Sequence, residues 1–282
     1  MIENLFLCVG AQKAGTTWLY TQLDNHPEIA FSDVKEIHYF NTIHNGSLLL
    51  SSRKVEHLKR LINNNKTALE RYFTNLSRGM ELDPGIQKLL GPVDDQWYIN
   101  AFQSRGKKYC ADFSPEYALL PKAGFDNVKM VSKNQKIIYL MRDPLSRSKS
   151  AIQYFFQTQG IDPKDINSKM IDDASKKDFI INLSSYHKTI RALKSEFQEN
   201  ALKFMFFEDI MRDKEAAIGE VCRFLEIATP SVKQEKLEQR INTSKSIEFT
   251  QDFDDRMMEV LAPVYEFMRT EFSHLPQQWR AK

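Results

Sequence analysis

Short runs of apolar, strand-forming residues recur along this chain of 282 residues, and stretches with apolar residues at helical spacing lie between them. The runs of the strand type are residues 5–9, 28–31, 108–113, 136–141 and 202–207. The stretches of the helical type are residues 16–26, 145–156, 180–197, 208–225 and 256–269. This alternation predicts an α/β fold of three layers, in which helices flank both faces of a central, mostly parallel sheet.

Two stretches depart from this alternation. Residues 41–105 have no strand pattern, and their loops are rich in Asn and Gly. Their helical stretches are residues 54–62, 68–76, 83–90 and 96–102. Residues 157–173 are polar, which predicts a mobile loop. Because the sequence shows no linker, no internal repeat and no second domain, we expect a single domain over residues 1–282, with a helical insertion at about residues 41–105.

A loop with two glycines, GAQKAGTT (residues 10–17), joins the first predicted strand to the first predicted helix. The glycines bracket a tight turn, which leaves backbone N–H groups facing a concavity with the positive end of the helix dipole behind them. Phosphate binds in concavities of this kind. Lys13 adds a movable cation, and the hydroxyls of Thr16 and Thr17 add hydrogen-bond donors in the first helical turn.

The position of the lysine indicates which phosphate ligand fits this loop. A P-loop of the nucleotide triphosphatases reads GxxxxGK[ST], with its lysine directly after the second glycine. Here Thr16 follows Gly15, and Lys13 lies inside the loop. The loop is therefore P-loop-like, but its lysine reaches across the front of the loop toward the terminal group of a donor linked through its 5′ end.

A second motif, RDPLSRSKS (residues 142–150), begins at the end of a buried strand and continues into the next helix. Pro144 suits the first turn of that helix. The guanidinium of Arg142 and the hydroxyl of Ser150 can hold a phosphate from two sides. For Arg147 we expect a salt bridge on the surface. Ligands of parallel sheets bind at the carboxyl ends of the strands, so this motif and the glycine loop should meet at one site.

Composition narrows the classes of function. The 39 basic and 37 acidic side chains nearly balance, which argues against bulk binding of nucleic acid. The three cysteines (Cys8, Cys110 and Cys222) are widely spaced, so we expect buried free thiols, and we see no His/Cys cluster for a metal. We see no apolar run long enough to span a bilayer and no leader pattern before the first strand, so we expect a cytoplasmic protein.

The two motifs resemble those of sulfotransferases that use 3′-phosphoadenosine 5′-phosphosulfate (PAPS). In that family the glycine loop binds the 5′-phosphosulfate, and an arginine followed eight residues later by a serine binds the 3′-phosphate. The resemblance implies that PAPS is the donor, that 3′-phosphoadenosine 5′-phosphate (PAP) is the product, and that no metal is needed. The residues that it assigns to the donor are Gln12, Lys13, Ala14, Gly15, Thr16, Thr17, Trp18, Arg142 and Ser150.

The segment KEIHYF (residues 35–40) resembles a KExxFF-like segment of the heparan-type branch of the family, in which the glutamate is the catalytic base. Glu36 occupies that position. A base is needed because an acceptor hydroxyl is a poor nucleophile until its proton is removed. Cytosolic small-molecule sulfotransferases use a histidine base, so His38 is the alternative. We favour Glu36 and interpret Lys35 as a positioning residue or an exposed one.

Later segments resemble the family more weakly. The segment YCADFSPEY (residues 109–117) resembles the family's GE(K/A)SPxY pattern, in which Asp112 could orient the acceptor or serve as a structural partner. Phe113 replaces a lysine that heparan-type enzymes often have, which weakens the case for a polysaccharide acceptor. We nevertheless expect Phe113, like Asp112, Glu36 and His38, to contact the acceptor. The resemblance also implies Tyr186 in the adenine pocket and Lys245 over the 3′-phosphate, with a core tyrosine and a solvated lysine as the alternatives.

The resemblance implies an enzyme that transfers a sulfuryl group from PAPS to a hydroxyl or amine of an acceptor, either a carbohydrate or a small metabolite. Lys13 would neutralise the charge that develops on the leaving phosphate. A P-loop kinase is one alternative. Two residues argue against it: Thr16 follows the second glycine where a kinase has lysine, and Arg142 ends the strand where a kinase needs an acidic Mg²⁺ ligand. A non-catalytic module that binds a nucleotide or a carbohydrate is the other. No pattern specifies the acceptor or the oligomeric state.

Overall fold

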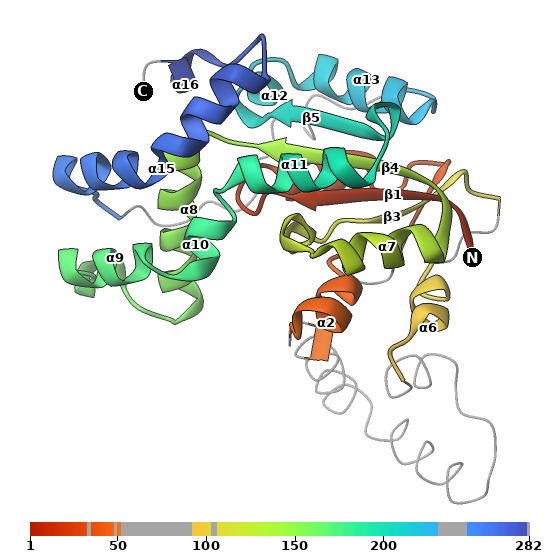
Figure 1. Cartoon of the computed structure of the whole chain (residues 1–282), viewed down its shortest axis with the longest axis horizontal. Helices are drawn as coiled ribbons and strands as arrows, with labels where there is room; N and C mark the ends of the chain where they lie inside the picture. Colours follow the sequence, from red (N-terminus) through yellow and green to blue (C-terminus); the bar gives the residue numbers. More distant parts are fainter. Residues whose placement is uncertain (33–34, 48–49, 52–91, 103–105, 231–246, 281–282) are drawn as a thin grey trace, which may run out of the picture.

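The computed structural model describes residues 1–32, 35–47, 50–51, 92–102, 106–230 and 247–280, and these contain one five-stranded sheet. The strands are β1 (Ile2–Gly10), β2 (Ile29–Phe31), β3 (Tyr109–Asp112), β4 (Ser132–Met141) and β5 (Leu202–Phe206). Their order is β2-β3-β1-β4-β5, and every neighbouring pair is parallel (Figure 1). An isolated antiparallel bridge joins Ser32 to Phe102. The expected α/β fold with a parallel central sheet is confirmed.

The two central strands are apolar on both faces. Residues 5–9 of β1 and residues 137–141 of β4 are buried. A central parallel strand contacts helices on both sides, which favours an uninterrupted apolar run over an alternating one. The register places Leu7 of β1 opposite Asp112 of β3, and Gly10 opposite Tyr139 of β4. The loops that follow β1, β3 and β4 therefore leave the sheet at the same edge.

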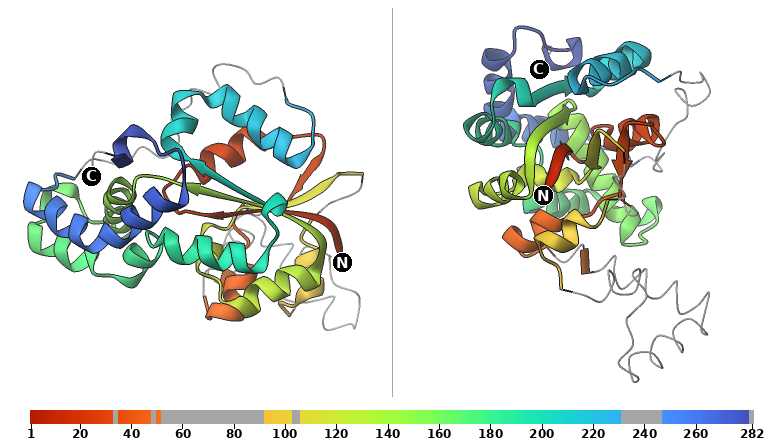
Figure 2. Two further views of the ribbon diagram at one scale, coloured as in Figure 1. Left: turned by 45° about the horizontal axis from the view of Figure 1, so that its top comes forward. Right: turned by 90° about the vertical axis from the view of Figure 1, so that its right-hand side faces the viewer.

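Helices cover the sheet on both sides. Helices α1 (Thr16–Leu23) and α13 (Lys214–Leu225) lie on one face, and α7 (Lys122–Val131) and α11 (Tyr186–Glu196) lie on the other (Figure 2). The remaining described α-helices are α2 (Tyr39–Asn45), α6 (Asp95–Ile99), α8 (Pro144–Thr158), α9 (Ser168–Ser175), α10 (Asp178–Asn182), α12 (Phe207–Arg212), α15 (Gln251–Glu271) and α16 (Gln277–Arg280). Of these, α8, α9 and α15 gather beyond the carboxyl ends of the strands (Figure 1). Short 3₁₀ helices cover residues Pro115–Leu119, Pro163–Asp165 and Glu199–Ala201.

Two stretches predicted to be helical are helical, but each is divided between two helices. Residues 208–225 are divided between α12 and α13, because the Asp213 carboxylate accepts a hydrogen bond from the backbone N–H of Ala216 and so starts a new helix. Residues 180–197 are divided between α10 and α11, which a turn at residues 183–185 separates.

The prediction of a loop at residues 157–173 is also wrong in part. Helix α8 continues to Thr158. Helix α9 begins directly after Asn167, whose side chain accepts a hydrogen bond from the backbone N–H of Met170. This cap satisfies a backbone donor that the first turn leaves free, and Ile171 is buried from the inner face of the helix. Amphipathic spacing within a polar stretch was the signal that the sequence analysis missed.

The expected insertion at residues 41–105 can be described only at its two ends. Helix α6 corresponds to the predicted helical turn at residues 96–102. The helices predicted at residues 54–62, 68–76 and 83–90 lie outside the described residues, and the single domain stays a prediction. Helix α7, which packs against α2, was not predicted.

Two further findings concern the chain as a whole. Within the part of the chain that the structure describes, no helix is both long and apolar enough to cross a bilayer. Cys8, Cys110 and Cys222 are buried and form no disulfide bond, which confirms the prediction of buried thiols.

Candidate active site

The loops after β1, β3 and β4 meet at the carboxyl edge of the sheet. The glycine loop (residues 10–17) is tied to the end of β4 by a hydrogen bond of 2.6 Å from the Ala11 N–H to the Leu140 carbonyl. Within the loop, the Ala14 N–H donates to the Ala11 carbonyl over 3.1 Å, which closes the turn. The strand ends therefore bring together the two motifs that the sequence analysis identified as phosphate sites.

The two loop glycines have positions that a side chain would disturb. Gly10 has φ of 142°, and a Cβ there would lie 2.7 Å from the Pro115 carbonyl oxygen. Gly15 precedes α1 in the left-handed region with φ of 94°, and a Cβ there would lie 2.9 Å from the ring of Phe207. These positions favour glycine, so the glycine spacing follows from the shape of the loop.

Lys13 also has a left-handed backbone, with φ of 70°. Its ammonium lies 4.5 Å from the centre of the Tyr154 ring, on the second half of α8. Burial lowers the pKa of Lys13, and the positive charges of Arg142 and Arg147 lower it further. Three cationic side chains therefore surround the glycine loop.

Arg142 follows β4 directly and contacts the glycine loop. Its Nη1 donates to the Lys13 carbonyl at 3.5 Å, and its guanidinium lies 5.0 Å from the centre of the Phe207 ring. Ser150 lies two turns into α8 and is partly exposed. Arg142 thus lies beside the glycine loop, and the binding of a 3′-phosphate by Arg142 and Ser150 stays a prediction.

Tyr186 is buried beneath Arg142. Its hydroxyl donates to the Arg142 carbonyl over 2.7 Å, and its ring packs against those of Tyr139 and Trp279. This arrangement corresponds to the core tyrosine that was the alternative interpretation. Its contact with adenine stays a prediction.

The other residues assigned to the donor differ in exposure. Thr16 and Trp18 are buried in α1, and Ala14 is buried in the loop. The Gln12 Oε1 atom is buried and has no hydrogen-bond partner among the described residues. Lys245 lies outside the described residues, so its role stays a prediction.

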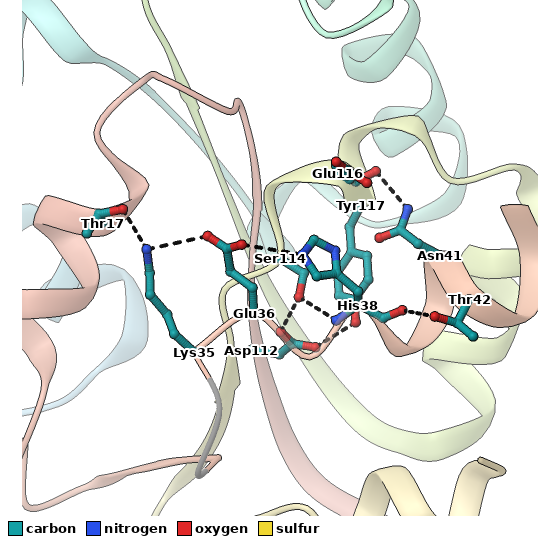
Figure 3. A network of polar contacts seen from close by, with 10 residues as sticks. All are labelled: Thr17, Lys35, Glu36, His38, Asn41, Thr42, Asp112, Ser114, Glu116 and Tyr117. Carbon is teal, nitrogen blue, oxygen red and sulfur yellow. Dashed lines mark hydrogen bonds and ion pairs between the residues drawn. The ribbon is translucent and has the colours of Figure 1, made fainter. Parts of the chain in front are cut away.

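A chain of polar contacts leads from the glycine loop to the candidate bases (Figure 3). The ammonium of Lys35 donates to the Thr17 hydroxyl over 2.5 Å and lies 3.6 Å from Glu36 Oε1. On the other side, Glu36 Oε2 lies 3.4 Å from His38 Nε2. Glu36 retains 25% exposure, whereas His38 retains 2%. Lys35 therefore bridges the two motifs, and the carboxylate of Glu36 is the more accessible of the two bases.

Asp112 supports this segment from below. Its carboxylate accepts hydrogen bonds from the hydroxyls of Ser114, Tyr117 and Tyr98 at 2.7, 2.7 and 3.2 Å. Burial raises the pKa of Asp112, and the hydroxyl bonds offset part of that rise because they stabilise the carboxylate. Ser114 in turn accepts from the His38 backbone N–H at 3.1 Å, so the Asp112 cluster fixes the base segment.

Asp112 and Phe113 were also expected to contact the acceptor. Both are fully buried, and Phe113 packs edge-on against the rings of Phe6 and Tyr20. Neither side chain is exposed in this structure, and contact of either residue with an acceptor stays a prediction. The phenylalanine in place of lysine completes an aromatic cluster.

The expectation of a surface salt bridge for Arg147 is wrong. Its side chain is 0% exposed, its Nε donates to the Ser184 hydroxyl at 2.7 Å, and its Nη2 donates to the Ile180 carbonyl at 2.7 Å. Its Nη1 lies 3.5 Å from the Gln12 carbonyl of the glycine loop. A local sequence pattern could not place this arginine inside the fold.

A brace from the end of the chain, which no local sequence pattern predicted, holds the segment after Arg142. Glu208 Oε1 accepts from the backbone N–H of Asp143 at 2.8 Å, and Glu208 Oε2 accepts from Trp279 Nε1 at 3.0 Å. The Tyr265 hydroxyl donates to Asp143 Oδ2 at 2.7 Å. Helices α15 and α16 therefore hold the residue that follows Arg142, and no local signal marks these long-range partners.

We expect Trp279→Phe to weaken PAP binding by about 3- to 10-fold. The phenyl ring keeps most of the packing, but the hydrogen bond to Glu208 is lost, which costs about 1 kcal/mol and loosens the Arg142–Asp143 segment. Isothermal titration with PAP measures the affinity, and Tyr265→Phe tests the same brace from its other side. An unchanged affinity in both variants would show that the brace serves folding alone.

Among the described residues, no group of three or more His, Cys, Asp or Glu side chains could hold a metal ion. The candidate site combines the glycine loop, the four cations Lys13, Lys35, Arg142 and Arg147, and the Glu36–His38 pair.

Comparison with known proteins agrees with this arrangement. The family model described as "Sulfotransferase domain" matches residues 3–259. The chain belongs to this family. A Membrane-associated sulfotransferase kil1 of Dictyostelium discoideum is 29% identical over 158 residues, which is 55% of this chain and 23% of that protein. The chain thus aligns with about a quarter of the length of this sulfotransferase.

Solved structures of other sulfotransferases share the fold. The sulfotransferase from Alicyclobacillus acidocaldarius is 17% identical, with a TM-score of 0.66 over 99% of this chain and 100% of that one. The mouse sulfotransferase SULT7A1, solved as a complex with PAP, is 14% identical, with a TM-score of 0.50 over 99% of this chain and 87% of that one. At these identities the likeness establishes the sulfotransferase fold.

Proposed function

We propose that this chain transfers a sulfuryl group from PAPS to a hydroxyl or amine of an acceptor, either a carbohydrate or a small metabolite. The observation that carries the proposal is the row of contacts Thr17–Lys35–Glu36–His38, which joins the phosphate-type loop to an accessible base. Membership of the sulfotransferase family supports the reaction type. The PAP complex of the mouse relative supports the choice of donor.

The residues of the site fit a donor of high negative charge. Lys13, Arg142 and Arg147 are close enough for the arginines to lower the pKa of the lysine, and no ion pair with a described carboxylate neutralises them. Loop N–H groups and the hydroxyls of Thr16 and Thr17 supply further donors. Such a set favours a ligand with several phosphate-like groups over a neutral ligand.

PAPS, when bound, supplies the sulfuryl group and the leaving bisphosphate. The acceptor atom bonds to sulfur as the bond from sulfur to the bridging oxygen breaks, and the electron pair of that bond stays on the 5′-phosphate. We assign Lys13 to the charge that builds on this phosphate, because a fixed cation there stabilises the transition state more than the ground state. Arg142 and Ser150 hold the 3′-phosphate, so their binding energy aligns the donor.

Glu36 takes the acceptor proton in this proposal. Its carboxylate is partly exposed and lies between the ammonium of Lys35 and the ring of His38. His38 is buried behind it and orients the carboxylate through its Nε2 atom, while the backbone of His38 is fixed by Ser114. The acceptor therefore meets the glutamate first, and the histidine acts as a positioning residue.

Thermal unfolding with PAP, and separately with ATP plus Mg²⁺, tests the proposed donor. We expect PAP to raise the unfolding midpoint by several degrees, because a ligand present at 100 times its Kd stabilises the native state by about 2.7 kcal/mol. ATP plus Mg²⁺ should give a smaller shift. A shift with ATP plus Mg²⁺ alone would contradict the proposal and favour a kinase.

A further inference from the structure

Arg147 is a buried cation in an unfavourable place. It lies in the first turn of α8, where the positive end of the helix dipole disfavours a cation. Its side chain is 0% exposed, and burial lowers its pKa. A charge removed from water destabilises a protein unless an opposite charge lies close by.

The structure provides no such opposite charge among the described residues. The three hydrogen bonds of Arg147 go to a hydroxyl and two carbonyls, on Ser184, Ile180 and Gln12. The charged and titratable groups that face it are Lys13 and Arg142, which have the same sign, and the phenols of Tyr139 and Tyr186. The hydrogen bonds satisfy the geometry of the guanidinium, but no described carboxylate compensates its charge.

The position of Arg147 indicates which ligand could compensate its positive charge. Its side chain reaches from α8 to the carbonyl of Gln12, so it contacts the loop that we propose to bind the donor. Arg147 and Ser150 are three residues apart on α8, and therefore lie on the same side of that helix. A polyanion bound in front of the loop would act on Arg147 through a buried, weakly screened environment.

We propose that Arg147 is a buried positioning residue that destabilises the free protein and stabilises its complex with a nucleotide bearing several phosphate or sulfate groups. It holds the glycine loop through the Gln12 carbonyl, and the bound anion supplies the missing negative charge. This inference rests on the proposed donor site and adds to it a group that does not touch the donor.

Arg147→Gln tests the inference, because glutamine keeps an amide donor for Ser184 or Ile180 but removes the charge. We expect this variant to unfold without ligand at a temperature equal to or above that of the wild type, and to bind PAP at least 10-fold more weakly. Arg147→Lys keeps the charge without the planar fork. We expect it to unfold earlier without ligand but to bind PAP within about 3-fold of the wild type.

Calorimetric titration with PAP and thermal unfolding without ligand provide the two readouts, and Arg212→Gln is the control. Arg212 is 69% exposed and pairs with Asp209 at 2.9 Å, so its loss should change neither quantity appreciably. A purely structural arginine would give Arg147→Gln a lower unfolding temperature together with unchanged PAP affinity. That result, or equal loss of PAP affinity in the glutamine and lysine variants, would overturn the inference.

Inorganic sulfate separates this inference from the proposed function. At 10 mM sulfate we expect the unfolding midpoint of the wild type to rise, and that of Arg147→Gln to rise less. If the wild type bound no PAP but kept this difference, the proposed donor would be wrong and the buried charge would still be linked to an anion. Equal response of both proteins to sulfate would overturn the inference, whatever the result with PAP.

Discussion

Replacing Lys13 by methionine should lower the rate of sulfuryl transfer by about 10²- to 10³-fold, while the affinity for PAP falls by less than about 10-fold. Removing one preorganised group that stabilises developing charge typically costs this much in turnover. The Arg142 and Ser150 side chains and the loop N–H groups stay in place to bind the product. Single-turnover transfer from PAPS and calorimetric titration with PAP measure the two quantities.

Lys169→Met is a matched control for this variant. Lys169 is 86% exposed and pairs with Asp173 on α9, so its loss should leave transfer unchanged. Turnover in Lys13→Met close to that of the wild type would show that the lysine does not act on the leaving group. A loss of PAP affinity as large as the loss of turnover would assign it to binding alone.

The pH profile offers a second test of Lys13. Burial and two neighbouring arginines lower its pKa below the ordinary value of 10.5. Lysine is charged below its pKa, so kcat/KM for the donor should fall as pH rises through that lowered value, since this parameter reports the free enzyme. Lys13→Arg should shift this alkaline limb to higher pH, because arginine stays protonated throughout. An alkaline limb at the same pH in both proteins would contradict the role of Lys13.

Replacing Glu36 by glutamine should lower transfer to an acceptor by about 10²- to 10⁴-fold, the range typical of a general base. Glutamine has nearly the same shape but cannot accept the proton. Lys35 lies between Glu36 and the glycine loop, so Glu36 does not contact the loop directly. The affinity for PAP should therefore change little. Transfer from labelled PAPS to a panel of phenols, sugars and amino sugars measures the effect.

Two further variants serve as the control and as the test of the alternative base. Glu266→Gln removes an exposed carboxylate of α15 and should be silent. His38→Asn should reduce transfer less than Glu36→Gln does, because His38 is buried and acts by orienting the carboxylate. The reverse order, with Glu36→Gln nearly as active as the wild type and His38→Asn inactive, would make the histidine the base.

Local sequence determined the central strands and the glycine loop. The apolar runs at residues 5–9 and 137–141 are buried on both faces, as is typical of a parallel sheet covered by helices, and the sheet has that form. Gly10 and Gly15 have backbone angles and close neighbours that favour glycine, so their spacing specifies the turn. These features depend on neighbouring residues, which is why the sequence reveals them.

The relation between Glu36 and His38 was open in the sequence and became clear only in three dimensions. Both residues can act as bases, and their separation of two positions along the chain does not indicate which of them is exposed. The tertiary structure buries His38 against Ser114 and leaves Glu36 partly open beside Lys35. Exposure depends on what packs over each side chain, and that packing comes from segments more than 70 residues away.

Arg147 shows the limit of sequence analysis most clearly. An arginine between two polar residues at the start of a helix is ordinarily exposed, and the fold instead places it in contact with the glycine loop with no described carboxylate as partner. Likewise, Trp279 reaches the segment after Arg142 only because α15 and α16 pack over it. The sequence by itself determined the elements and the phosphate-type motifs, since these depend on local spacing; the tertiary structure decided burial and partnership, because both depend on contacts between distant segments.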